Sequence, residues 1–126
     1  MRNIIWDYLT IKNKDSYDTN LIISFGNGCI SSKRIFEENY KIGYTKRDIP
    51  NGKYPDSGWK FFVGNEDDAY TNDTNNMQIY ALESIIKHDP EIEKYLNAPN
   101  EAAFIRINDH EFIQDDGTQK IYISKK

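Results

Sequence analysis

Few side chains in this 126-residue chain are of the types that perform nucleophilic chemistry. Cys29 is the one cysteine, and a thiolate nucleophile needs a base within hydrogen-bond reach. The two histidines, His88 and His110, are the candidate bases. We expect His88 to close a helix and His110 to lie in a hairpin turn, while Cys29 packs as a small apolar residue in a strand. The sequence therefore predicts no catalytic residues.

A run of acidic residues suggests a different chemistry, the binding of a hard cation. Glu66, Asp67 and Asp68 are followed by Asp73, and carboxylates are ligands that calcium and magnesium prefer. The run lacks the alternating ligand positions, central glycine and distal glutamate of a calcium-binding loop. Gly26-Asn27-Gly28 lacks the third glycine and the following helix of a dinucleotide site, and is interpreted as a turn. We expect a solvated acidic loop, with no metal and no cofactor.

The segment before this loop is a predicted strand rich in aromatic residues. Between Trp59 and Val63 bulky side chains fall on both faces of the strand, so we expect it at the centre of a sheet. Aromatic side chains beside fixed charge are typical of interface hot spots. The candidate partner-binding residues are Tyr44, Arg47, Trp59, Glu66, Asp67 and Asp68. Alternatively Trp59 and Phe61 are plain core residues, which we favour for Phe61.

Apolar periodicity predicts the elements that position these residues. Period-two runs bounded by turn residues indicate strands. The strands expected in the first half of the chain cover 21–25, 29–32, 40–45 and 59–63. The first two would form a hairpin, and residues 1–18 are interpreted as an appendage that is either a short helix or an edge strand.

Two consecutive short helices are predicted next. Apolar residues recur at helical spacing from Met77 to His88, with Asn75 or Asn76 as the N-cap. Asp89-Pro90-Glu91 predicts a second helix that runs to Leu96, because a capping Asp precedes Pro at the first helical position.

The C-terminal part returns to strand periodicity. The expected strands are 103–107, 112–113 and 121–123, joined by turns at Asp109-His110 and at residues 115–117. The predicted fold is α+β, a single domain over residues 1–126. It has a mainly antiparallel sheet, with two short consecutive helices inserted before a C-terminal three-strand meander.

Composition limits the classes of partner. A net charge of −4 and a pI near 5.1 argue against nucleic-acid binding, which relies on clustered Lys and Arg, and suit a basic partner better. One cysteine permits no intrachain disulfide. Asp7 interrupts the N-terminal apolar run before it reaches the length of a signal peptide, and no stretch is long enough to span a bilayer. We therefore expect a cytoplasmic protein with no membrane contact.

Four segments resemble the immunity protein 33 family, small bacterial proteins whose genes lie near polymorphic toxins. These segments are 28–33, 40–44, 56–62 and 64–67. The third is the most specific, because it joins Ser57-Gly58-Trp59 to a basic residue and Phe61. The resemblance covers roughly residues 28 to 112, with a weaker match at 103–106 and Glu111-Phe112. Asn65 stands where the family pattern leads us to expect an acidic residue.

The resemblance implies a cytoplasmic immunity protein that binds and neutralises a cognate toxin by occlusion, without catalysis. One alternative is a small ligand-binding or enzyme-like domain, in which Trp59, Tyr44 and the carboxylates from Glu66 to Asp68 line a pocket. Another is a protein-interaction module unrelated to toxins.

Overall fold

A computed structural model of the chain describes residues 28–50 and 56–126. The predicted strand at 21–25, the hairpin that it would start and the predicted appendage at 1–18 lie outside these residues. No helix of the described part is long and apolar enough to cross a membrane.

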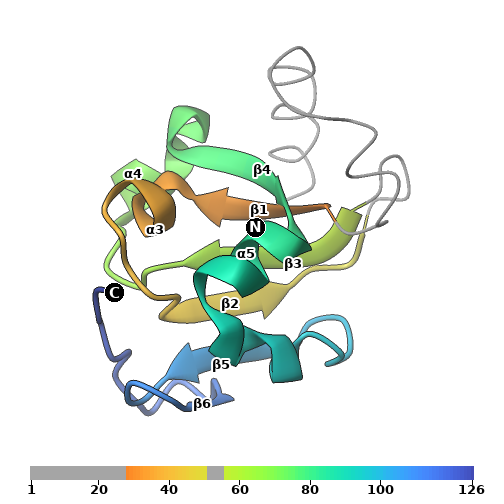
Figure 1. Ribbon diagram of the computed structural model, residues 1–126, viewed down its shortest axis with the longest axis vertical. Helices are drawn as coiled ribbons and strands as arrows, with labels where there is room; N and C mark the ends of the chain where they lie inside the picture. Colours follow the sequence, from red (N-terminus) through yellow and green to blue (C-terminus); the bar gives the residue numbers. More distant parts are fainter. Residues whose placement is uncertain (1–27, 51–55) are drawn as a thin grey trace.

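A six-stranded mixed sheet forms the centre of a single α+β domain, which confirms the predicted fold class (Figure 1). The strand order is β4-β1-β3-β2-β5-β6, in which β1 and β3 are parallel and the other neighbours are antiparallel. The strands are β1 (Gly28–Ser32), β2 (Tyr44–Arg47), β3 (Asp56–Phe62), β4 (Met77–Ala81), β5 (Ala103–Arg106) and β6 (Phe112–Gln114). The predicted strand at 29–32 is confirmed as β1, whereas β2 begins later than the predicted 40–45.

The aromatic strand β3 is central, as predicted, because it pairs with β1 on one side and β2 on the other. Trp59 and Phe61 point to one face and Lys60 and Phe62 to the other, and all four are buried. The buried ammonium group of Lys60 lies 2.7 Å from an Asp48 carboxylate oxygen.

Short helices pack on the Trp59 face of the sheet. They are α3 (Lys33–Glu37), α5 (Leu82–His88) and the 3-10 helix η2 (Pro90–Tyr95), and Figure 1 shows α3 and α5 lying over this face. Their apolar side chains Ile35, Ile85 and Ile92 join Trp59 in one core cluster. Two further helices, α4 (Asp68–Asn72) and η1 (Thr74–Asn76), lie between β3 and β4 in the chain.

The prediction of one helix from Met77 to His88 is wrong in its first half. Residues 77–81 form the edge strand β4, in which Met77, Ile79 and Ala81 are buried and alternate with half-buried residues. The apolar positions of this segment fit both a period of two and a helical period, and antiparallel pairing with β1 decides for the strand. Helix α5 follows directly, without a side-chain cap at Ala81.

Asp89 occupies the N-cap position of the second predicted helix, but its side chain does not cap it. The segment after it is the 3-10 helix η2, and the Asp89 side chain makes no cap hydrogen bond. It is 2% exposed, and its Oδ2 accepts a hydrogen bond from Ile42 N at 3.0 Å. The Asp89 carboxylate therefore binds the backbone before β2 instead of the first backbone N–H groups of the helix.

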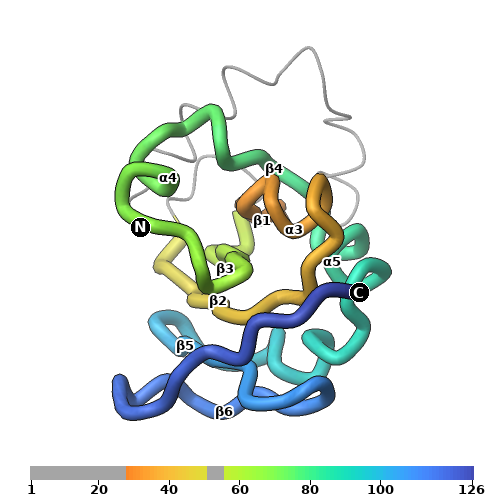
Figure 2. Tube along the Cα trace, turned by 90° about the vertical axis from the view of Figure 1, so that its left-hand side faces the viewer, coloured from red at the N-terminus to blue at the C-terminus, as the bar shows by residue number. Residues whose placement is uncertain are grey.

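The C-terminal part contains two of the three predicted strands. β5 and β6 form an antiparallel pair, and bends at 108–110 and 117–119 lie close to the turns predicted at 109–110 and 115–117. Residues 121–123 are not a strand. Instead the C-terminal segment runs beside the residues that precede β2, with Lys41 N donating to Ser124 O at 2.8 Å and Lys126 N donating to Asn39 O at 2.8 Å (Figure 2).

The Ser57-Gly58-Trp59 motif forms an irregularity in the β1–β3 pairing. The register shifts between Gly28 and Ile30, and Ser57 Oγ donates to Gly28 O at 2.7 Å. Gly58 has a φ of +86°, and a Cβ at this position would overlap the carbonyl oxygen of Asp48. The motif is thus explained by backbone geometry.

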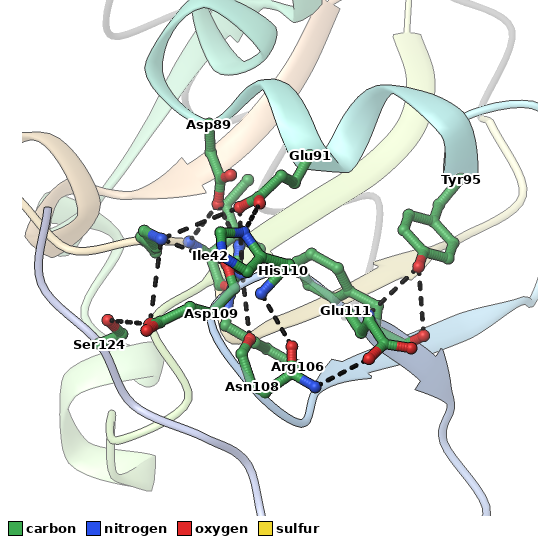
Figure 3. A network of polar contacts seen from close by, with 12 residues as sticks. Ile42, Asp89, Glu91, Tyr95, Arg106, Asn108, Asp109, His110, Glu111 and Ser124 are labelled. Carbon is green, nitrogen blue, oxygen red and sulfur yellow. Dashed lines mark hydrogen bonds and ion pairs between the residues drawn. The ribbon is translucent and has the colours of Figure 1, made fainter.

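A buried arginine joins β5 to the helical layer and to the entry of β2 (Figure 3). Arg106 is 0% exposed, its Nη2 lies 2.6 Å from Asp89 Oδ2, and its Nε donates to Ile42 O at 2.7 Å. Nη1 donates to Asp109 O at 2.7 Å. A buried guanidinium requires such a complete set of acceptors, because its desolvation costs several kcal/mol.

Gly58→Ala should lower the free energy of unfolding by about 3 kcal/mol or more, because it combines an unfavourable positive φ with a backbone clash. Gly117→Ala is the matched control, since Gly117 has a φ of +81° but nothing within 4 Å of the added Cβ. The control should cost only about 1 kcal/mol. Urea unfolding measures both, and equal losses would show that the close approach at Gly58 is unimportant.

Asp89→Asn should lower the free energy of unfolding by about 3–5 kcal/mol, because it leaves the buried Arg106 charge without its carboxylate. Glu93→Gln removes an exposed carboxylate from η2 and should change stability by less than about 0.5 kcal/mol. A comparable small effect for both variants in chemical denaturation would contradict the importance of the buried pair.

Candidate functional site

An open groove of about 270 Å³ lies where β2 and β3 meet the C-terminal segment. It is lined by Tyr44, Phe62, Gly64, Glu66, Asp68, Thr71 and Ile121. Three of the residues predicted to bind a partner, Tyr44, Glu66 and Asp68, are therefore brought together.

The aromatic part of the groove is a cross-strand pair. Tyr44 lies opposite Phe62 in the β2–β3 register, and their ring centroids are 5.9 Å apart. Burial raises the pKa of Tyr44, and the negative charges of Asp115 and Asp48 raise it further. The half-buried hydroxyl therefore stays neutral at physiological pH and can donate or accept a hydrogen bond.

The acidic loop begins with a tight turn that Glu66 closes on itself. Its two carboxylate oxygens accept hydrogen bonds from Val63 N at 2.9 Å and from Gly64 N at 2.8 Å. Gly64 has a φ of +106°, and a Cβ there would lie 2.6 Å from Ile121 Cγ2. The Gly-x-Glu spacing of the sequence is therefore explained by this turn. The absence of a side chain at Gly64 also lets Ile121 of the C-terminal segment pack against the turn.

The next two carboxylates differ in their partners. Asp67 is the N-cap of α4, where its Oδ1 accepts a hydrogen bond from Tyr70 N at 2.8 Å. Asp68 is exposed in the first turn of α4. Within residues 28–50 and 56–126, its carboxylate has no ion pair or side-chain hydrogen bond. Of the three acidic residues predicted for partner binding, Asp68 is thus the one whose side chain is exposed and has no partner among the described residues.

Trp59 and Arg47 do not line the groove. Trp59 is 0% exposed, and its Nε1 donates to Leu96 O at 3.2 Å. Arg47 is half-buried beside the Trp59 ring, and its Nη1 donates to Ala98 O at 2.8 Å. The alternative that Trp59 and Phe61 are core residues is confirmed by their burial.

Sequence reasoning missed four lining residues: Phe62, Gly64, Thr71 and Ile121. Phe62 and Gly64 lie in segments that resemble the family, but neither was predicted to bind a partner. Thr71 had no distinguishing signal within the polar stretch after the acidic run. Ile121 was assigned to a strand, and only the path of the C-terminal segment brings it against the Gly43 and Gly64 backbone.

A second cluster of polar side chains lies at the surface end of the Arg106 network (Figure 3). His110 Nδ1 lies 2.6 Å from Glu91 Oε2, and Lys41 Nζ lies 3.9 Å from Glu91 Oε1. Burial by itself would raise the pKa of Glu91. The hydrogen bond with His110 and the positive charges of Lys41 and Arg106 outweigh it, so the pKa lies below its ordinary value.

Cys29 and the two histidines do not form a nucleophilic centre. Cys29 is 0% exposed, burial raises the pKa of its thiol, and its Sγ donates to Tyr80 O at 3.3 Å. His88 is the last residue of α5, and its Nε2 lies 2.8 Å from Tyr40 O. His110 is 80% exposed in its side chain and outside the groove. Within the part of the chain that the structure describes, no three His, Cys, Asp or Glu side chains gather as a metal-ligand set.

Glu91→Gln should lower the melting temperature near neutral pH but not at strongly acidic pH. A carboxyl whose folded pKa is lowered stabilises the protein above its unfolded pKa, and this contribution is lost as pH falls through the folded pKa. Thermal unfolding between pH 7 and pH 2 should show the wild-type and variant curves converging at the acidic end. A difference that does not change with pH would contradict the ionic role of Glu91.

Comparison with known proteins places the chain in a family. A model of the immunity protein Imm33 domain matches residues 29–116, which is more than half of the 126 residues. No curated protein and no solved structure matches the chain. The matched region runs from the second residue of β1 past the end of β6 and includes all of the groove except Ile121. The chain therefore belongs to the Imm33 immunity protein family, and its general function is immunity.

Proposed function

We propose that this immunity protein binds a cognate toxin domain in the bacterial cytoplasm and neutralises it by covering its active site, without catalysis. The observation that carries the proposal is the groove on a member of the Imm33 family, because it places Tyr44, Glu66 and Asp68 together at an open surface. Pockets of this kind anchor hot-spot residues of a partner protein.

Exposed apolar side chains extend this surface. Tyr122 and Ile123 are 41% and 39% exposed, and they follow the groove residue Ile121. The Ile123 side chain also lies close to Gly64, because a Cβ added to Gly64 would lie 3.2 Å from Ile123 Cδ1. A specific inhibitor interface buries about 1,600 Å² in total, so the groove would form the centre of a larger contact.

The enzyme-like alternative has less support. It requires Trp59 in the pocket lining, but Trp59 is buried in the core on the other face of β3. Both carboxylate oxygens of Glu66 accept backbone hydrogen bonds, so Asp68 is left as the one carboxylate of the lining with a free oxygen among the described residues. Paired acid and base catalysis needs two such groups.

Cells that express the toxin encoded by the neighbouring gene should grow again when this immunity protein is co-expressed. Ile123→Ser should weaken binding of that toxin by about 10-fold, because it removes an apolar contact beside the groove. Ile49→Ser is the matched control, since Ile49 is 58% exposed and does not line the groove. Thermal unfolding would establish that both variants fold. Unchanged killing in the presence of the wild-type protein would contradict the proposed function.

A further inference from the structure

We propose that the groove receives one lysine or arginine side chain of the toxin, with its alkyl stem between Tyr44, Phe62 and Ile121 and its charged group at Asp68. This inference rests on the proposed function and specifies the chemistry of its central contact.

The size of the groove favours a single side chain. Its volume of about 270 Å³ is just below the roughly 300–1,000 Å³ that is typical of small-molecule sites. It is also open to solvent, as a side chain entering from a neighbouring protein requires.

The walls suit the stem of a long basic side chain. Tyr44 and Phe62 present two tilted rings, and Ile121 supplies an aliphatic wall. Lysine and arginine bury their methylene groups along such surfaces and keep the charged end at a polar edge. A cation near the Tyr44 ring would gain a further attraction from its π-electrons.

The charges around the groove select a cation. Glu66 and Asp68 are the charged lining residues, and none of the described residues that line the groove is basic. Arg34 contacts the acidic loop, where its Nη1 donates to Asn65 Oδ1 at 2.9 Å, but its charge is paired with Glu38, whose Oε2 lies 3.5 Å from Arg34 Nε. The excess negative charge therefore falls on Asp68.

The same charges disfavour other occupants. A phosphate or carboxylate would meet two carboxylates and no compensating cation in the lining. An apolar anchor such as leucine would fit the walls, but it would cover the Asp68 carboxylate without giving it a partner, which carries a desolvation cost.

The test uses a catalytically inactive form of the toxin encoded by the neighbouring gene and measures its dissociation constant by calorimetry. Asp68→Asn should weaken binding by about 10-fold, and Asp68→Lys by about 100-fold or more, because the second variant places like charges together. Glu83→Gln removes an exposed carboxylate from α5, outside the groove, and should change the dissociation constant by less than about 2-fold.

Each Lys and Arg on the toxin surface is then changed to Met, which keeps an apolar stem but removes the charge. One such substitution should weaken binding to the wild-type protein by about 10-fold and leave binding to the Asp68→Asn variant unchanged. Equal affinity of wild type and Asp68→Asn, with no coupled toxin cation, would overturn the inference and identify an apolar anchor. Absence of binding by the wild-type protein would instead overturn the proposed function itself.

Discussion

The buried contact between Arg106 and Asp89 is the interaction on which much of the remaining structure depends. It joins β5 to the start of η2, and both groups also hold the backbone of Ile42: Asp89 accepts from its N–H and Arg106 donates to its carbonyl. The guanidinium is fully buried, so any loss of these acceptors would leave a charge without compensation in the core. The geometry of this region is therefore confined to one arrangement.

This contact also helps to position two walls of the groove. Ile42 stands two residues before Tyr44, and the Arg106 N–H donates to Gly43 O at 2.8 Å, so the start of β2 has a defined position. On the opposite wall, Tyr122 N donates to Arg106 O at 2.8 Å, which places the neighbouring Ile121 against Gly64. A polar network on one side of the sheet thus sets the distance between groove walls on the other side.

Several residues in the segments that resemble the family have structural roles in this protein. Gly58 permits a bulge in β3, Gly64 and Glu66 build the turn that follows, and Asp67 caps α4. These roles are structural, yet they bring the exposed Asp68 to the groove. An exposed charge beside aromatic walls can accelerate association with an oppositely charged partner as well as hold it.

The features that depend on local physics could be predicted from the sequence. Alternating bulky residues specified the central strand at Trp59, and turn residues located the breaks near 109–110 and 115–117. The acidic run marked the turn after this strand and the start of α4 at Asp68. Local patterns failed where two structures satisfy the same pattern: Met77 to Ala81 fits a helix or a strand, and pairing with β1 selected the strand. Only the tertiary structure could decide that Asp89 binds Arg106 rather than capping a helix, and that Ile121 completes the groove. Both outcomes depend on partners 17 or more positions away in the chain, a separation at which side-chain identity carries no information on contact.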